Sequence, residues 1–580
     1  MQDYLKRHIE RVLSAMHAEL SDGADGDGLP EGTAVEFEQP ANPDHGDLAT
    51  NVALRLAGHF RKAPRAIATE IMERLEATPL DPKRVASVEV AGPGFLNFRF
   101  ASSWLADSLA GILEEGESFG RTRVDEASSD EAAPPTALVE FVSANPTGPL
   151  TVGHGRNAVL GDTIANLLEW CGYDVTREYY FNDAGRQMRI LGESVRARYL
   201  DLVDTHIPRK TIGEGDDAIE VPEPFPEDGY RGDYIVDIAS DMAAEHGPAL
   251  GDSEDSTVFK EAAEKAIFAD IERTLERLGI SMDSYFNERT LYDSGRVWEI
   301  VETFKQKDLA YEKDGAVWFR TTEFGKDKDT VLIKSSGEPT YRLPDIGYHA
   351  DKLDRDFDRI VDVFGADHIA TFPDVLSGVE SLGYDPGRID VVIYQFVTLV
   401  RGGEPVKMST RKATYVTLDE LMDEVGEDVT RYFFLMRSPN THLEFDLDLA
   451  REASEKNPVF YLQYAHARIC SILRKAEEVG FRFEKDVDLS LLTHESEEAL
   501  IKELLGLPDA IRRAADTYEP HRLANYLRDV AVAFTAFYGN CRIVGEEESL
   551  ATARMKLAVA ARRVLRNGLS ILGISAPDRM

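Results

Sequence analysis

The sequence predicts a multidomain α/β protein with a parallel sheet core, an α+β module before it and an all-α bundle after it. Between about residues 136 and 441, β-branched runs alternate with helical periodicity, which is the pattern of a parallel sheet. From about residue 442 to 580 helical spacing continues without strand signals, for example at Val459, Leu462, Ala465, Ile469 and Leu473. A chain of 580 residues has room for about three to five domains.

The first 120 residues predict the small α+β module. Apolar residues at Leu5, Ile9, Val12, Leu13, Met16 and Leu20 keep helical spacing. A second helix is expected to break at Pro64. Val88–Val90 and Phe95–Phe100 flank a Gly-Pro-Gly turn and predict a hairpin. Residues 121–135 are polar and end in Pro-Pro, so they predict a linker.

The core predicts several strands and one long helix. The helix is expected at Gly155–Cys171. Residues from about 191 to 292 are helical, loop-rich and acidic, which indicates an insertion. The strands are expected at Thr136–Val142, Asp174–Phe181, Ala316–Arg320, Thr330–Ile333, Arg359–Phe364 and Asp390–Val400.

Composition predicts a cytoplasmic protein with no membrane partner. Hydrophobic residues make up 43% of the chain, which is typical of a globular protein. No apolar run approaches the roughly 18 residues of a membrane span, and the N-terminus lacks a secretory pattern. The three cysteines, Cys171, Cys470 and Cys541, stand far apart, which excludes a disulfide framework and a Cys-x-x-Cys zinc site.

The chain is strongly acidic, with 65 Lys and Arg against 104 Asp and Glu and a net charge of −39. Such a surface either repels nucleic acid or forms a solvated coat suited to a salty cytosol. Acidic residues crowd Ser21–Gly28, Asp125–Glu131 and Gly213–Asp217, whereas Lys and Arg recur on the motifs described next. This placement favours the solvated coat and predicts a halophile-like protein.

The strongest motif runs from Val139 to Ala158, where a predicted strand ends in a Pro/Gly loop and a helix begins near Gly155. The first N–H groups of such a helix and its dipole attract an anion. Gly153 permits close backbone approach, and His154 can donate a hydrogen bond to a phosphate. The alternative is an ordinary strand–helix loop with a capping histidine.

A second motif, Val406–Lys412, follows another predicted strand. Its cations Lys407, Arg411 and Lys412 on a Gly-tethered loop could neutralise a departing pyrophosphate. The alternative is a solvated basic loop. If the strands before the two motifs belong to one sheet, both motifs lie at its carboxyl edge, where nucleotides bind in open α/β folds.

The two motifs resemble the paired signatures of class I aminoacyl-tRNA synthetases, which end in Gly-His and run Lys-Met-Ser. The run Ser-Ala-Asn-Pro-Thr-Gly-Pro-Leu-Thr-Val-Gly-His-Gly-Arg-Asn at 143–157 resembles arginyl-tRNA synthetases in particular, and residues 457–468 resemble that family's anticodon-binding bundle. The resemblance implies a Rossmann-like catalytic domain at 136–441 with an insertion at about 191–292. It also implies an N-terminal module at 1–120 that binds the tRNA elbow, and a helical anticodon-binding domain at 442–580.

The implied reaction joins ATP and L-arginine into arginyl-adenylate and then transfers arginine to tRNA-Arg. We expect a monomer without a tightly bound cofactor, and no metal site of its own, because Mg²⁺ would arrive with ATP. The resemblance implies His154 and Lys407 as catalytic residues. It implies ATP contacts from Thr151, Gly153, His154, Asn157, Asp367, His368, Lys407, Met408, Ser409 and Arg411.

The sequence departs from the family pattern at two positions. Thr151 stands where the first signature usually has His, so His154 is expected to carry more of the charge. Thr410 stands where class I enzymes usually place a second Lys, and either Arg411 or Lys412 could substitute for it.

Arginine selection requires carboxylates, because a guanidinium pairs best with them in a bidentate fork. Glu140 and Asp345 supply carboxylates, and Tyr341 stands four residues before Asp345. The alternatives are a surface acid for Glu140 and a helix cap for Tyr341 and Asp345. The sequence leaves open which carboxylate binds the guanidinium. The resemblance implies that Asp183 and Gln187 line the cleft, and that arginine is bound by Glu140, Ser143, Asn145, His154, Tyr341 and Asp345.

For tRNA, aromatic residues that stack on unpaired bases and arginines that contact phosphate are expected, with core aromatics of a bundle as the alternative. The predicted tRNA contacts are Asn42, His45, Tyr461, Tyr464, Arg468 and Arg562, with His466 a further candidate. Two other functions remain open: a catalytically inactive tRNA-binding scaffold, favoured by Thr151 and Thr410, and a class I synthetase for another amino acid.

Overall fold

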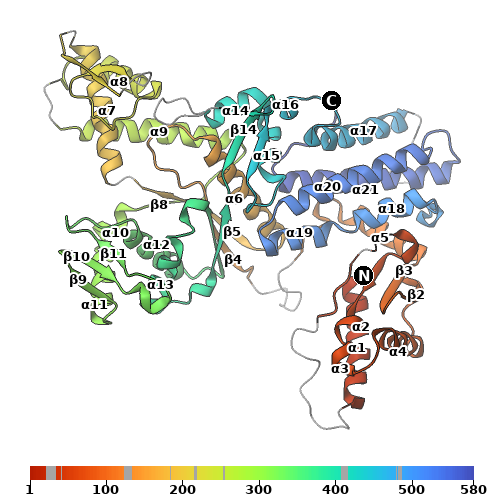
Figure 1. The fold of residues 1–580 in the computed structure, drawn as a ribbon. Helices are drawn as coiled ribbons and strands as arrows, with labels where there is room; N and C mark the ends of the chain where they lie inside the picture. Colours follow the sequence, from red (N-terminus) through yellow and green to blue (C-terminus); the bar gives the residue numbers. More distant parts are fainter. Residues whose placement is uncertain are drawn as a thin grey trace. The chain divides into compact units, whose positions relative to one another are not determined.

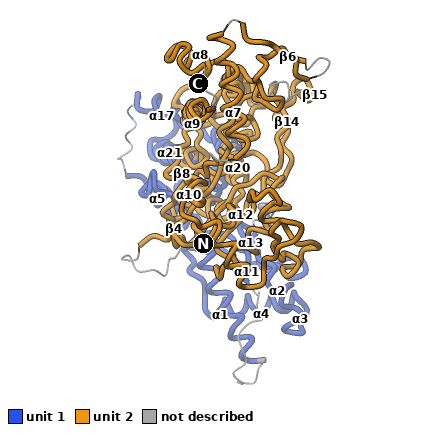
Figure 2. Tube along the Cα trace, turned by 90° about the vertical axis from the view of Figure 1, so that its left-hand side faces the viewer, with its two compact units in different colours: residues 1–119, 469–506, 532–564 blue, residues 120–468, 507–531, 565–580 orange. Residues whose placement is uncertain are grey.

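The computed structural model describes residues 1–20, 34–38, 40, 42–122, 133–182, 185–204, 206–213, 218–251, 255–406, 416–478, 480, 482 and 486–580. The chain forms two compact units (Figure 2). Unit 1 comprises residues 1–119, 469–506 and 532–564, and unit 2 comprises residues 120–468, 507–531 and 565–580. The domain boundaries inferred from the sequence remain predictions.

Unit 1 contains the predicted N-terminal helix, α1 (Gln2–Leu20), and the predicted hairpin, β2 (Val85–Ala91) with β3 (Phe95–Phe100). Strand β1 (Leu48–Thr50) completes an antiparallel sheet in the order β1-β3-β2. Pro64 begins a helix instead of ending one, because its fixed φ suits the first helical position. The helices of this region are α2 (Val52–Arg55), α3 (Ala57–Phe60), α4 (Pro64–Ala77) and α5 (Ser102–Glu115).

The core of unit 2 is a five-stranded sheet (Figure 1). All its strand pairs are parallel. Its members, in the order they lie, are β13 (Ile389–Tyr394), β12 (Arg359–Gly365), β4 (Thr136–Glu140), β5 (Asp174–Phe181) and β8 (Ser284–Asn287). Strands β5 and β8 extend the sheet on one side of β4, whereas the later strands β12 and β13 extend it on the other side. The direction in which strands are added therefore reverses between β4 and β12. Ligands of open α/β sheets bind at such a reversal, beyond the carboxyl ends of the strands.

Three expectations about the core were wrong. The segments Ala316–Arg320 and Thr330–Ile333 belong to a separate antiparallel sheet of β9 (Ala310–Lys313), β10 (Ala316–Phe319) and β11 (Thr330–Ile333). Asp390–Val400 is two strands, because β14 (Val397–Arg401) leaves the main sheet to pair with β15 (Glu404–Pro405) and β16 (Leu443–Asp446). Strand β8 lies inside the range that the sequence assigned to an insertion.

The helices of the described chain follow the predicted pattern more closely. The long helix of the first signature, α6 (Val152–Trp170), begins three residues earlier than expected. None of the helices in the described ranges combines the length and apolar content needed to cross a membrane. The remaining helices are α7 (Arg186–Val203), α8 (Asp233–His246), α9 (Thr257–Arg277), α10 (Arg289–Asp293), α11 (Arg296–Gln306), α12 (Arg342–Asp354), α13 (Phe372–Leu382), α14 (Leu418–Val425), α15 (Glu427–Leu435), α16 (Leu447–Ala450), α17 (Pro458–Glu478), α18 (Glu495–Leu504), α19 (Leu507–Thr517), α20 (His521–Asn540) and α21 (Glu548–Ile571). A hairpin of β6 (Arg209–Ile212) and β7 (Ile219–Pro222) follows α7.

Candidate active site

The chain leaves β4 through a strained turn. Val142 and Ser143 have φ values of 65° and 42°, a left-handed conformation that is costly for a β-branched residue such as valine. The buried side chain of Asn157 holds this turn: its Oδ1 accepts the Val142 N–H at 2.6 Å, and its Nδ2 donates to the Val363 carbonyl at 2.9 Å. The predicted ATP residue Asn157 therefore joins the ends of β4 and β12.

Helix α6 begins with Thr151 as its N-cap and His154 in its first turn. The Thr151 N–H donates to His154 Nδ1 at 3.2 Å, so the ring proton of neutral His154 is on Nε2. The Thr151 hydroxyl lies 3.3 Å from the same nitrogen. Burial lowers the pKa of His154 and keeps the ring neutral. Thr151 thus fixes the ring, and His154 is left with one N–H to donate.

The three glycines of α6 meet different surroundings. A Cβ at Gly155 would approach Leu418 Cδ1 to 2.6 Å and Phe434 Cε2 to 2.9 Å, and one at Gly161 would overlap Phe141. These two glycines allow α6 to pack tightly. At Gly153 a Cβ would meet only the Thr151 hydroxyl, at 3.7 Å, so packing within the described chain does not require glycine there. Such open space is what close approach of a ligand requires.

We therefore expect Gly153→Ala to affect ATP binding and Gly155→Ala to affect stability. Gly153→Ala should leave the thermal midpoint unchanged or slightly higher, because alanine favours helix, while it raises the KM for ATP about tenfold, equivalent to about 1.4 kcal/mol. Gly155→Ala should destabilise by about 1–3 kcal/mol through overpacking. Thermal unfolding and ATP-dependent kinetics of both variants provide the measurement. A Gly153→Ala enzyme with wild-type ATP kinetics would contradict this role.

The residues of the second signature, Lys407, Met408, Ser409 and Arg411, lie outside the described residues, as does Asp183. The chain that follows the signature is described, and it contacts the first signature directly. Thr417 forms a β-bridge with Thr151, and the Leu418 N–H donates to the Leu150 carbonyl at 2.8 Å. The premise that one sheet carries both motifs was wrong, since β14 is in its own sheet. The first signature is nevertheless bridged to the chain that follows the second signature.

Arg156, the buried arginine of the first signature, makes a second link. Its guanidinium donates to the carbonyls of Gln395, Thr441 and Ser438 at 2.5, 3.0 and 3.1 Å. These carbonyls flank β14 and β16. The helix that presents His154 is therefore fixed to the small sheet that leads into the second signature.

Three carboxylates lie side by side across the middle of the main sheet. Glu140 of β4 is the register partner of Asp362 on β12 and of Glu178 on β5. All three are buried, so each requires a nearby cation. Glu140 is thus a buried residue of the sheet interior, not a surface acid.

Helix α12 supplies those cations. Lys352 Nζ lies 2.5 Å from Glu140 Oε2 and 2.6 Å from Asp362 Oδ1, and Arg355 pairs with Glu178 at 2.6 Å. Burial disfavours the Asp362 anion, yet Lys352 and His349 together lower the pKa of Asp362 to about 2. Glu140, His349 and Asp362 have the spacing of metal ligands, but the Lys352 ammonium lies among them and pairs with both carboxylates.

A second pair of acidic residues faces the same end of the sheet. Asp345 on α12 and Glu288, just after β8, both act on Tyr180 and Tyr292 and, after burial, raise the pKa of both hydroxyls. Tyr180 Oη donates to Glu288 at 2.6 Å. Burial raises the pKa of Asp345 to about 7, with further contributions from Glu288 and Glu140, although His349 and Lys352 act in the opposite direction. The charged form of Asp345 would therefore be stabilised by a further positive charge.

The other predicted arginine contacts lie near this group. Ser143 Oγ donates to Glu140 at 2.9 Å and accepts the Tyr180 N–H at 3.1 Å, and Asn145 Nδ2 donates to Gln187 at 2.8 Å. Tyr341 precedes α12 and is 71% exposed, so its ring borders solvent one turn before Asp345.

Two of the predicted ATP contacts, Asp367 and His368, follow β12. Asp367 and His368 form the short turn Ala366–His368, and both side chains are exposed. The His368 ring stacks on Phe364 at 5.1 Å between centroids. Both residues therefore lie at the carboxyl end of β12, across the sheet's reversal from His154.

The predicted tRNA residues have contrasting environments. On α17, Phe460, Tyr464 and Arg468 form a ladder, with Tyr464 stacked on Phe460 at 6.1 Å and Arg468 over the Tyr464 ring at 5.7 Å. Tyr461 and Arg562 are half-buried. His466 is 1% exposed and bonds to the Pro577 carbonyl, so this candidate is wrong.

In unit 1, Asn42 and His45 are both exposed. Asn42 Oδ1 accepts the Asp44 N–H at 3.0 Å. His45 ends the short turn Pro43–His45.

Sequence reasoning missed the acid Glu288 and the cation Lys352. Both left a signal. Asp345, His349 and Lys352 stand at i, i+4 and i+7, so they form a polar stripe on a helix whose other residues are largely apolar. Glu288 directly follows a strand, as expected of a ligand-binding residue in a parallel sheet.

The fold and the paired signatures together define the class I aminoacyl-tRNA synthetases. Sequence profiles agree: residues 123–438 match "tRNA synthetases class I (R), catalytic domain", residues 3–100 match "Arginyl tRNA synthetase N terminal domain", and residues 462–580 match "DALR anticodon binding domain". Curated relatives include the arginine–tRNA ligases of Salinibacter ruber, 61% identical over 100% of both chains, and of Desulfotalea psychrophila, 50% identical over 94% of each.

Solved structures agree as well. A chain titled as an arginyl-tRNA synthetase of Campylobacter jejuni is 30% identical, with a TM-score of 0.73 over 83% of this chain and 100% of that one. The arginyl-tRNA synthetase of Thermus thermophilus shares the fold, at 23% identity and a TM-score of 0.74 over 99% of this chain and 100% of that one. The chain belongs to the arginyl-tRNA synthetase family. The predicted family, multidomain α/β fold class and synthetase activity are confirmed.

Proposed function

We propose that this arginine–tRNA ligase activates L-arginine with ATP at the reversal between β4 and β12, and then transfers it to the terminal ribose of tRNA-Arg. The observation that carries the proposal is the β-bridge of Thr151 with Thr417, because it joins the first signature to the chain that follows the second one. No covalent enzyme intermediate is required, since positioning and charge stabilisation suffice for this chemistry.

The arginine carboxylate attacks the α-phosphate of ATP, and pyrophosphate leaves. His154 donates a hydrogen bond from its Nε2–H to the phosphate, and the N-terminus of α6 adds its N–H groups and dipole. Lys407 and Arg411 neutralise the pyrophosphate. Thr151, Gly153, Met408, Ser409, Asp367 and His368 line the ATP site, with Asn157 holding the loop. Mg²⁺ would come bound to the ATP phosphates.

Asp345 and Glu288 receive the substrate guanidinium. Glu140 already has a cation in direct contact, Lys352, and a hydroxyl donor, Ser143, whereas burial raises the pKa of Asp345 to about 7, so that a substrate guanidinium would stabilise its charged form. A guanidinium binds two carboxylates in a planar fork, which a lysine ammonium cannot reproduce. Glu140, Ser143 and Asn145 then form the side of the site toward the strained turn, and Tyr341 covers the solvent side.

The test is charging of tRNA-Arg by the purified protein with each of several amino acids, alongside His154→Ala and Lys407→Ala. We expect arginine alone to be charged, and each variant to lose about 10²- to 10³-fold in rate through lost transition-state stabilisation. Charging of a different amino acid would replace the proposed substrate. A protein that binds tRNA-Arg but consumes no ATP with arginine would be the inactive scaffold.

Arginine binding should depend on pH through Asp345. The substrate guanidinium stays protonated throughout, whereas Asp345, with a pKa of about 7, must lose its proton to pair with it. The apparent affinity for arginine should therefore rise about tenfold per pH unit below pH 7 and level off above it. Arginine KM from pH 5.5 to 8.5 checks this, and Asp345→Asn should abolish the slope. A flat wild-type profile would contradict the assignment.

We also infer that the tRNA elbow binds near Asn42 and His45, and that the anticodon end binds near Tyr461, Tyr464, Arg468 and Arg562. The ladder on α17 supports this, because an arginine stacked on an exposed tyrosine extends a surface on which bases stack.

The enzyme acts as a cytoplasmic monomer. Its charge of −39 forms a solvated coat that keeps it soluble and active at high salt. Sedimentation tests the monomeric state, and charging rates across a KCl series test the activity at high salt.

A further inference from the structure

The start of helix α14 bears directly on the first signature. Its N-cap, Thr417, forms the β-bridge with Thr151, and the Leu418 N–H donates to the Leu150 carbonyl at 2.8 Å. Thr151 in turn donates its N–H to His154 Nδ1 at 3.2 Å. A shift of α14 would therefore move Thr151 and change the direction in which the His154 ring points.

Arg277, the last residue of α9, contacts three carboxylates on α14 and α15. Its guanidinium donates to Asp419 Oδ1 at 2.6 Å. It also donates to Asp423 Oδ1 and to Glu427 Oε1, each at 2.9 Å. The Thr274 hydroxyl lies 2.5 Å from the other oxygen of Asp419. Because a guanidinium presents several N–H donors in one rigid plane, Arg277 binds carboxylates of both helices at once.

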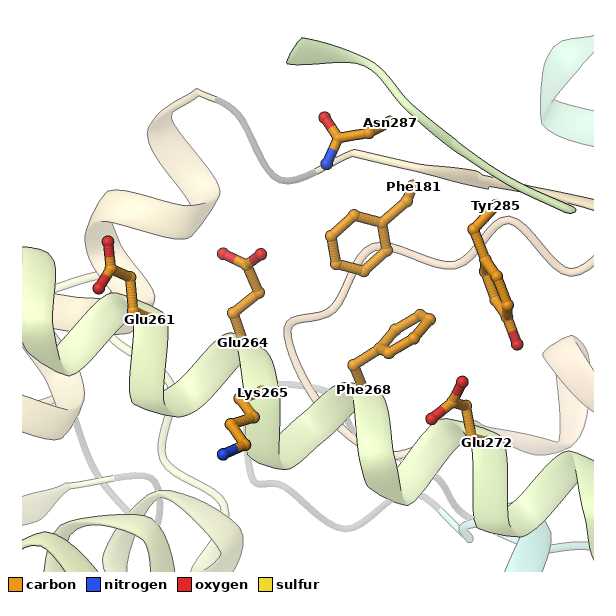
Figure 3. Close-up of a pocket in the computed structure, with 8 residues that line it drawn as sticks. All are labelled: Phe181, Glu261, Glu264, Lys265, Phe268, Glu272, Tyr285 and Asn287. Atoms are coloured by element: carbon orange, nitrogen blue, oxygen red, sulfur yellow. The ribbon is translucent and has the colours of Figure 1, made fainter. Parts of the chain in front are cut away.

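Helix α9 is itself anchored to the main sheet. Figure 3 shows Phe268 of α9 directed toward the rings of Phe181 on β5 and Tyr285 on β8, and the ring centroids lie 4.8 and 5.2 Å away. The carbonyl of Leu278, the residue after the helix, accepts a hydrogen bond from the buried Arg431 of α15 at 2.7 Å. The end of α9 is therefore a fixed support for the guanidinium that it carries.

Loss of this guanidinium would displace α14 without unfolding it. Asp419, Asp423 and Glu427 would be left close together as like charges, which repel one another. Arg273 lies 3.9 Å from Asp419, which is beyond hydrogen-bond distance. The capping box at the start of α14 does not involve Arg277, so the helix itself should stay folded.

We propose that Arg277 is a positioning residue for the activation reaction: it holds α14 in the place where Thr151 directs His154 at the α-phosphate of ATP. The proposal rests on the proposed function, in which His154 stabilises the charge that develops on that phosphate. Such stabilisation depends on the placement of the donor, so a small displacement caused by a distant residue lowers the rate.

The experiment is a double-mutant cycle between Arg277 and His154 in the full-length protein, measured by arginine-dependent ATP–pyrophosphate exchange with tRNA-Arg present. We expect Arg277→Gln to lower kcat about tenfold, while the KM for arginine changes less than about twofold. In His154→Ala, which lacks the ring to be positioned, the same substitution should change kcat less than about twofold. Arg277→Lys keeps the charge but not the planar fork, so it should recover part of the loss.

Arg74→Gln is the matched control. Arg74 is 28% exposed, against 30% for Arg277, and it pairs with Glu19 and Glu70 in unit 1. This variant should keep the wild-type kcat.

A loss caused by Arg277→Gln that is equally large with and without the His154 ring would overturn the proposal, because the substitution would then act independently of His154. A wild-type kcat in Arg277→Gln would overturn it as well. Failure of the proposed function is seen separately, as wild-type protein that exchanges no pyrophosphate with arginine.

Discussion

Asp345→Asn should lower kcat/KM for arginine by about 10²- to 10³-fold, equivalent to about 3–4 kcal/mol, while the KM for ATP changes less than about twofold. The amide keeps the size of the carboxyl but not its charge. The substrate guanidinium would then be buried opposite Glu288 alone, with one of its two partners missing, and an incompletely paired buried charge is costly. Steady-state charging of tRNA-Arg with arginine and ATP varied separately gives both constants.

Asp351→Asn provides the matched control on the same helix. Asp351 is 39% exposed and pairs with Arg355 at 3.1 Å, two turns of α12 away from the acidic group. Its loss should leave kcat/KM for arginine within about threefold of wild type, as expected for a surface ion pair of at most about 1 kcal/mol. Equal losses in the two variants would show that α12 had shifted as a whole, and the assignment of Asp345 to the guanidinium would fail.

Lys352→Met should destabilise unit 2 by about 3–5 kcal/mol at neutral pH, because Glu140 and Asp362 are then left as adjacent buried carboxylates without a cation. The sign of the pH dependence follows from linkage. Burial already raises the folded-state pKa of Glu140, and without the Lys352 ammonium it rises further above its unfolded value of about 4. The penalty is therefore complete above the raised folded pKa, and it shrinks as pH falls toward 4. Thermal unfolding at pH 8 and pH 5 measures this change.

Two further variants separate the charge from the packing. In Lys352→Met/Asp362→Asn the second carboxylate is gone, so the double variant should regain part of the stability and lose most of the pH dependence. Lys334→Met removes a lysine that is 55% exposed and pairs with Glu338 at 3.6 Å, and it should change stability by less than about 0.5 kcal/mol. A Lys352→Met protein that unfolds at the wild-type temperature at both pH values would refute the charge-compensation account.

The two signatures could be located from sequence because each is a local feature. A run of glycine and proline after a β-branched segment, followed by helical periodicity, specifies a strand, a turn and a helix within twenty residues. That is how the sequence placed His154 at the start of α6. The helix begins three residues before the predicted position. Thr151 and His154 hydrogen-bond to each other as the N-cap and the first turn, so the helix starts at Val152.

Strand membership could not be found in the same way. Thr330–Ile333 and Arg359–Phe364 both read as strands, and both are strands, but they belong to different sheets. A strand's partners lie at large sequence separations. The side chains of a strand indicate how buried it is, but they do not indicate which strands it pairs with. The break between β13 and β14 is similar: Arg156, far earlier in the chain, bonds to the Gln395 carbonyl there.

The sequence by itself determined the family, the fold class, the paired signatures and the types of residue that arginine and ATP require. Chemistry of that kind depends on which side chains are present and on their local spacing. Only the tertiary structure showed which carboxylate already forms an ion pair inside the protein. Glu140 and Asp345 are both acidic residues in the sequence, but Lys352, 212 residues after Glu140, pairs directly with Glu140, while burial raises the pKa of Asp345. Charge balance in a buried site is a property of all the groups packed around it.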